Sequence, residues 1–144
     1  MIRPLFRIID ANFNRSREGL RVCEELARFV LNSPRLTSEL KAVRHSISDI
    51  TRSHRASASL LCDARDAAED VGRVSHIPTE MRRAGYSDVC AANMQRVEES
   101  LRVLEEFLKL VDADASAECS RLRFKVYDIE KKLIKKLQHY KGKS

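Results

Sequence analysis

The sequence contains no tryptophan, only four glycines and three prolines among 144 residues, and 6% aromatic residues. Charged residues reach 33%, and this balance favours helices over sheets. No apolar run approaches the roughly 20 residues that a bilayer-spanning helix needs. The opening MIRPLFRIID is too short and becomes charged too early to be a secretory signal. We therefore expect one cytoplasmic domain over residues 1–144, with no membrane partner.

Two kinds of site are excluded by what the sequence lacks. The four cysteines have no Cys-x-x-Cys spacing and no histidine at ligand spacing, which argues against a zinc or thioredoxin-like site and predicts buried, reduced thiols. The glycines are too dispersed for a phosphate-cradling loop, and no G-x-x-x-x-G-K-[ST] motif occurs. Any anion site must therefore be built from side chains and helix ends.

One helical segment occurs twice in the sequence. Residues 11–30 align without a gap on residues 92–111 and agree at ten of twenty positions, seven of them polar or small. With the offset changed from 81 to 79, residues 39–50 align on 118–129. The repeat, 11–50 and 92–129, predicts an all-α fold in which two pseudo-symmetric helical hairpins form a four-helix bundle. The connecting segment 51–91 is expected to cap one end and to serve as a functional loop.

The second helix of each hairpin has a regular apolar seam. Ser33 and Pro34 predict an N-cap and a first-turn proline. The seams, spaced 4, 3, 4, 3 or nearly so, are Leu36, Leu40, Val43, Ile47 and Ile50, and Leu122, Val126, Ile129, Leu133 and Leu137.

The first helix of each hairpin carries a second, mixed stripe besides its apolar face. The two copies are Ala11, Arg15, Glu18, Val22 and Glu25, and Ala92, Arg96, Glu99, Val103 and Glu106. Such a stripe is either a sheltered polar surface or a solvated face with ion pairs three and four residues apart. The apolar residues beside the charges, Val22, Phe29, Val103 and Leu110, lead us to expect a homo-oligomer.

The charged and amide side chains suit phosphate chemistry. Arginines at 15, 21, 44, 65, 96 and 102 are able to clamp phosphates, and Asp66 and Asp70 to hold a hydrated Mg²⁺. Asn12 and Asn93 lie near the expected helix starts, where an amide either caps the helix, the simpler role, or reads the edge of a heterocycle.

Four sequence features in this order resemble a known family. They are ANFNRSREGLRVCEELARF, the pair Arg44-His45, ARDAAEDVG at 64–72 and AANMQRVEESLRVLEEFLKL at 91–110, and together they are similar to the alternative hydroxymethylpyrimidine-phosphate kinases. That family occurs alone or fused ahead of thiamine phosphate synthase, and fused chains often carry the synthase's name. The resemblance implies an ATP-dependent phosphotransferase that converts 4-amino-5-hydroxymethyl-2-methylpyrimidine phosphate to the diphosphate, with Mg²⁺ and ATP bound and the synthase as an expected partner.

The matched motifs and this chemistry together give a hypothesis for the site. We expect a cleft shared by the two stripes, with catalytic residues Arg15, Glu18, Arg96 and Glu99. Substrate or nucleotide would be bound by Asn12, Arg21, Arg44, Arg65, Asn93 and Arg102, and metal by Asp66 and Asp70.

Two other functions stay open at this point. The chain is alternatively a non-catalytic accessory or regulatory domain of a thiamine phosphate synthase. The end of the chain, with nine lysines and arginines from Arg121 onward against Asp128 and Glu130, is a weaker indication of nucleic-acid binding, because a charge run is usually a solvated helix face.

Overall fold

The computed structural model describes residues 2–53, 58–73 and 82–142, and these ranges contain helices and no strand. The expected all-α fold is confirmed. The elements are α1 (Ile2–Glu25), the π-helical turn η1 (Leu26–Val30), α2 (Pro34–Ser53), α3 (Ala58–Ala64), α4 (Tyr86–Leu108) and α5 (Ala113–Gln138).

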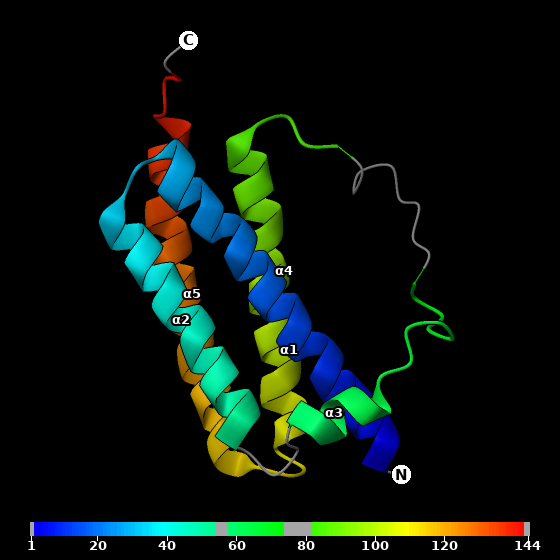
Figure 1. The fold of residues 1–144 in the computed structure, drawn as a ribbon. Helices are drawn as coiled ribbons and strands as arrows, with labels where there is room; N and C mark the ends of the chain where they lie inside the picture. Colours follow the sequence, from blue (N-terminus) through cyan, green and yellow to red (C-terminus); the bar gives the residue numbers. More distant parts are fainter. Residues whose placement is uncertain (1, 54–57, 74–81, 143–144) are drawn as a thin grey trace.

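The four long helices form a bundle of two hairpins. Figure 1 shows α1 and α2 as one antiparallel pair and α4 and α5 as the other, with α1 and α4 running in opposite directions. The most extensive packing joins α1 to α4 and α4 to α5, and α2 closes the bundle against α1 and α5. The two copies of the repeated segment therefore meet along α1 and α4.

The core consists of the predicted apolar faces. Both seams of the second helices are buried from end to end, and Leu20, Cys23, Leu101 and Leu104 are buried between the hairpins. Across the described ranges, no helix combines the length and the apolar character that crossing a membrane would require.

The cysteines follow the prediction with one exception. Cys23, Cys90 and Cys119 are buried free thiols, whereas Cys62 is exposed on α3. Burial raises the pKa of Cys119 to about 12, which keeps this thiol protonated and unreactive.

The predicted start of α2 is confirmed, whereas the starts of α1 and α5 differ from what the sequence led us to expect. The Ser33 hydroxyl accepts a hydrogen bond from the Leu36 N–H at 3.2 Å, as an N-cap should. Asp112 caps the start of α5 in the same way, since its carboxylate accepts a hydrogen bond from the Ala115 N–H at 3.0 Å. This cap was not predicted from the sequence. Helix α1 begins at Ile2, nine residues before the repeat does, because the buried Ile9 and the partly buried Leu5 and Phe6 extend its core-facing side.

The segment 51–91 differs from the expectation in one respect. We expected a short connection after the end of α2, but Ala58–Ala64 forms helix α3, which packs against α1 through the buried Leu61. A single turn or two of helix lacks the periodicity that would reveal it in the sequence. The turn and short helix expected around residues 75–87 lie largely outside the described residues.

Helices α1 and α4 approach each other most closely at Gly19. A Cβ atom at this position would lie 2.7 Å from Val97 Cγ2 and 2.8 Å from the Asn93 carbonyl oxygen. The carbonyl belongs to the backbone of α4, so the helix itself would have to move. Glycine at this position sets the spacing between the two repeats.

We expect Gly19→Ala to lower the free energy of unfolding by about 1–3 kcal/mol, because overpacking outweighs the roughly 1 kcal/mol that alanine gains over glycine in a helix. Urea unfolding followed by circular dichroism measures the change. Gly142→Ala is the control, since a Cβ there would meet only ordinary contacts with Tyr140, at 3.5 Å or more. A Gly19→Ala variant as stable as the Gly142→Ala variant would contradict the close approach.

Candidate ligand-binding site

The glutamates and arginines shared by the two repeats join the helices within each hairpin. Glu24 on α1 accepts hydrogen bonds from Arg44 on α2, the shortest at 2.8 Å. The equivalent Glu105 on α4 accepts from Arg123 on α5 at 3.2 Å. Because both pairs occupy matching positions of the repeat, their shared role is to hold the second helix of each hairpin against the first.

A second set of repeated charges stays within the first helices. Arg21 lies 3.4 Å from Glu24 and 3.2 Å from Glu25. Arg102 lies 3.1 Å from Glu105 and 3.5 Å from Glu106. The side chains of Arg21 and Arg102 are about half exposed, so these arginines form a solvated face with ion pairs beside the stripe, to which they connect through Glu25 and Glu106.

The two repeated asparagines have the same role, and it is not capping. Asn12 donates from its amide to the Ile8 carbonyl at 2.8 Å, and Asn93 donates to the Val89 carbonyl at 2.8 Å. Each bond reaches back one turn inside a helix, because α1 and α4 begin well before these residues. Asn12 is buried, and its Oδ1 atom accepts a long hydrogen bond from Arg15 at 3.5 Å.

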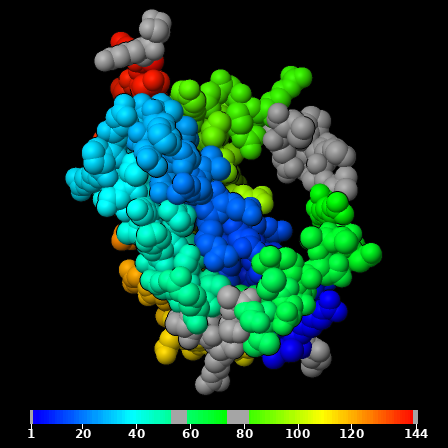
Figure 2. Space-filling view, viewed as in Figure 1, coloured from blue at the N-terminus to red at the C-terminus, as the bar shows by residue number. Residues whose placement is uncertain are grey.

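A groove of about 490 Å³ lies between the first half of α1 and the chain that follows α3. Figure 2 shows the surface hollowed between these two segments. Its polar lining combines residues from both sides: Arg7, Asp10, Asn12, Asn14, Arg15, Arg65, Asp66 and Asp70. Five of the predicted site residues meet there, namely Asn12, Arg15, Arg65, Asp66 and Asp70.

The groove is held together by a clamp between Arg65 and Asp10. Both carboxylate oxygens of Asp10 accept from the Arg65 guanidinium at 2.7 Å. Asp10 is buried, whereas about half of the Arg65 side chain is exposed. The carboxylate raises the pKa of Arg65 above its ordinary value, so this arginine stays charged. This contact fixes the start of the segment after α3 against α1.

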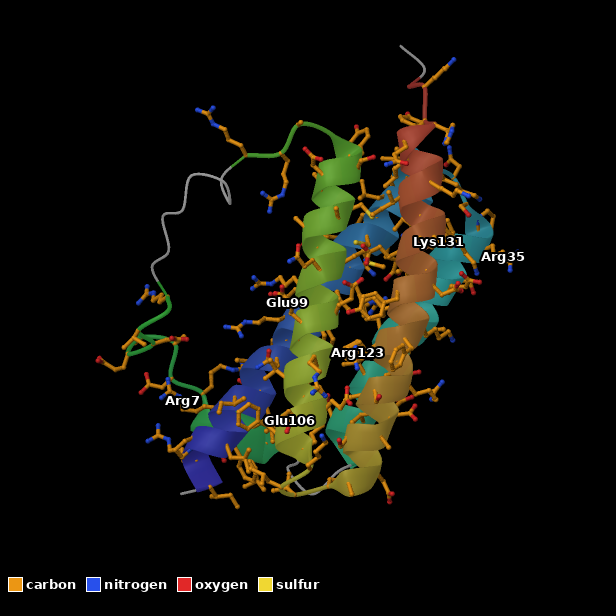
Figure 3. The ribbon with its side chains drawn as sticks, turned by 180° about the vertical axis from the view of Figure 1, so that it is seen from behind. Arg7, Arg35, Glu99, Glu106, Arg123 and Lys131 are labelled. Atoms are coloured by element: carbon orange, nitrogen blue, oxygen red, sulfur yellow. The ribbon has the colours of Figure 1, made fainter. Side chains whose placement is uncertain are left out.

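A second contact between the two walls comes from Arg7. Its guanidinium donates to the backbone carbonyl of Asp66 at 3.3 Å. Figure 3 shows Arg7 on the part of α1 beside this segment. The next residues fold into turns, in which the Asp66 carboxylate accepts from the Glu69 N–H and the Asp70 carboxylate accepts from the Gly72 N–H.

The two aspartates do not by themselves make a metal site. One oxygen of each serves a turn, at 3.2 Å for Asp66 and 2.8 Å for Asp70. Within the described ranges, no three histidine, cysteine or acidic side chains are grouped so as to hold a metal ion. The binding of Mg²⁺ and of ATP therefore stays a prediction.

The four residues expected to be catalytic are spread over the surface. Arg15 lines the groove with Asn12, but Glu18 lies in a different surface pocket together with Arg21 and Arg44. Arg96 and Glu99 are exposed on α4, and Glu99 accepts from Gln95 at 3.0 Å. In Figure 3, Glu99 lies on the edge of α4 away from α5. Each of the four is exposed in this structure, and no ion pair joins the arginines to the glutamates across α1 and α4.

The groove also contains polar residues that the sequence reading missed. These are Arg7, Asp10 and Asn14. When the alignment at offset 81 is extended toward the N-terminus, the second repeat has Asp88, Ala91 and Gln95 at the equivalent positions. A charge at Asp10 beside the buried Ile9 was a usable signal, since a buried carboxylate requires a partner. Differences between the repeats, rather than their agreement, would have pointed to these residues.

A family model, the ThiD2 family, matches residues 7–132. The chain belongs to the ThiD2 family. Similar proteins include the thiamine-phosphate synthases of Nostoc punctiforme (40% identity over 135 residues, covering 94% of this chain and 37% of the relative), Synechocystis sp. (41% over 137 residues, 92% and 38%) and Rhodopirellula baltica (38% over 142 residues, 99% and 37%). This ThiD2 chain thus spans little more than a third of these relatives. No solved structure matches it significantly.

These findings confirm the resemblance at the level of the family and correct the expected activity. The relatives are named as thiamine-phosphate synthases, so the prediction of an ATP-dependent pyrimidine-phosphate kinase is wrong. They favour the other reading, a helical domain associated with thiamine phosphate synthase. The link to thiamine biosynthesis is retained.

The clamp across the groove is tested by removing either partner. We expect Asp10→Ala and Arg65→Ala each to lower the free energy of unfolding by about 1–2 kcal/mol, since a charge-assisted pair with one half-exposed member is lost. The double variant should lose little more than either single variant, because the two residues act on each other.

The surface pair Arg52 and Asp49, with both side chains about 70% exposed, provides the matched control. Arg52→Ala should cost less than about 0.5 kcal/mol. Additive losses from Asp10→Ala and Arg65→Ala in chemical denaturation would show that the two side chains do not stabilise each other.

Proposed function

We propose that this chain is an accessory domain of thiamine phosphate synthase that binds a phosphorylated pyrimidine in the groove between α1 and the segment after α3. The observation that carries the proposal is the meeting of arginines from two separate parts of the chain, Arg7 and Arg15 on α1 and Arg65 beyond α3, at one groove. The family and the printed names of the relatives supply the biochemical setting.

One cation of the groove is available to a phosphate, although the lining as a whole has three arginines and three aspartates. Asp10 is paired with Arg65, and one oxygen of both Asp66 and Asp70 is bound to a backbone N–H. Arg15 has only a long contact to Asn12, so its guanidinium is the cation most available to a phosphate. The arginine would contribute charge-assisted hydrogen bonds, which are roughly twice as strong as neutral ones.

A heterocycle would be recognised by the neutral part of the same groove. The Asn12 amide is oriented by its bond to the Ile8 carbonyl, so its Oδ1 atom is a positioned acceptor for an exocyclic amino group. Ile8, Ala11 and Pro4 supply apolar surface for the ring. The domain would either hold the pyrimidine phosphate for the synthase or regulate the synthase according to the amount of pyrimidine phosphate present.

Isothermal titration with 4-amino-5-hydroxymethyl-2-methylpyrimidine phosphate tests the assignment. We expect Arg15→Ala to raise Kd at least tenfold, about 1.4 kcal/mol, because a phosphate contact is lost. The unphosphorylated pyrimidine should bind the wild-type chain more weakly and should be insensitive to Arg15→Ala.

Arg96→Ala is the matched control, since Arg96 occupies the equivalent position of the repeat and is absent from the lining of this groove. It should leave Kd within twofold of the wild-type value. Equal losses of affinity in Arg15→Ala and Arg96→Ala would show that the ligand contacts the stripes of both α1 and α4. No binding by the wild-type chain would refute the ligand assignment.

A further inference from the structure

Helix α5 has an aromatic surface that the equivalent helix of the first hairpin lacks. Phe124 is 62% exposed and Tyr127 46% exposed, and their ring centroids lie 6.4 Å apart. The positions that match them on α2 are His45 and Ser48. Because the same place in the same hairpin is polar on α2, the bundle does not require aromatic residues there.

The Phe124 ring is supported from one side. The Arg123 guanidinium lies 4.7 Å from the centroid of the Phe124 ring and is itself bound to Glu105. The ring thus rests on an ion pair that is part of the scaffold. An exposed aromatic side chain held in this way loses little conformational freedom when a partner covers it.

The helix that carries the two rings also carries unpaired positive charge. Lys125, Lys131, Lys135 and Lys136 are exposed on α5, and none of them has an ion pair among the described residues. The acids Glu118 and Asp128 are bound to Arg121 and Lys132, and one carboxylate oxygen of Glu130 is buried, so the exposed unpaired charge of this stretch is mainly positive. A surface complementary to this one has an apolar centre with acidic residues around it.

The relatives indicate which protein would supply that surface. In each relative the region similar to this chain makes up only 37–38% of the polypeptide, and the name printed for the whole is thiamine-phosphate synthase. Wherever the two parts share a polypeptide, a ThiD2 domain and the rest of a synthase stay close together. An aromatic surface on the bundle would be covered by that neighbour.

We infer that the face of α5 formed by Phe124, Tyr127 and Lys131 is the docking surface for thiamine phosphate synthase, which meets it with an acidic-rimmed apolar patch. This inference rests on the proposed function, in which the chain is accessory to the synthase. The ligand groove lies on α1, across the bundle from this face, and Figure 3 shows Arg7 and Lys131 far apart on different helices. Docking and ligand binding are therefore separable.

The test is the affinity of the full chain for full-length thiamine phosphate synthase of the same organism, measured by biolayer interferometry. The variant Phe124→His with Tyr127→Ser gives α5 the residues that α2 has at these positions, so the hairpin should fold. We expect its Kd to rise at least tenfold while the pyrimidine phosphate still binds with unchanged affinity. Lys125→Glu with Lys131→Glu should weaken docking as much, and added salt should weaken wild-type docking.

Phe29→Leu is the matched control, because Phe29 is 63% exposed on η1 and the repeat has Leu110 at the same position. It should leave docking unchanged. Wild-type chain that binds the pyrimidine phosphate but not the synthase would overturn the docking surface and leave the ligand assignment standing. Binding of a 20-nucleotide single strand, or self-association in sedimentation, that is lost in the aromatic variant would equally overturn it.

Discussion

The close approach of α1 and α4 at Gly19 is the constraint on which the rest of the structure depends. The two copies of the repeated segment pack directly on each other there, with the Asn93 carbonyl where a side chain would otherwise lie. Once α1 and α4 are fixed at this spacing, α2 and α5 are held beside them by the equivalent pairs Glu24 with Arg44 and Glu105 with Arg123. Construction of the bundle thus explains the repeated pairs of Glu24 with Arg44 and of Glu105 with Arg123.

The fold could be predicted from the sequence because its information is periodic and repeated. The apolar seams of α2 and α5 and the agreement between residues 11–30 and 92–111 predict two packed hairpins. The groove was harder to predict for a physical reason. Its clamp joins residues 55 positions apart, Asp10 and Arg65, and one wall follows a short helix with little periodicity. Agreement between repeats drew attention to Arg96 and Glu99, whereas the clamp has no counterpart in the second repeat.

Pseudo-symmetry also shows which residues the bundle does not need. Where α1 has Arg7, Asp10 and Asn14, α4 has Asp88, Ala91 and Gln95, and where α5 has Phe124 and Tyr127, α2 has His45 and Ser48. Both asymmetric sets are on the surface or next to it. The first set lines the proposed ligand groove beside the repeated residues Asn12 and Arg15, and the second forms the proposed docking face. Membership of the ThiD2 family and the names of the relatives support the synthase that we propose for the docking face.

Repeated ion pairs hold the bundle together, whereas we propose that ligand binding belongs to one groove, in which the repeated residues Asn12 and Arg15 meet the unrepeated Arg65. Amide chemical-shift mapping during titration with the pyrimidine phosphate tests this proposal. We expect shifts in residues 4–15 of α1 and in residues 65–72, with the amides around Glu24, Arg44, Glu105 and Arg123 unchanged. Shifts of similar size around Arg15 and Arg96, symmetric between α1 and α4, would contradict it.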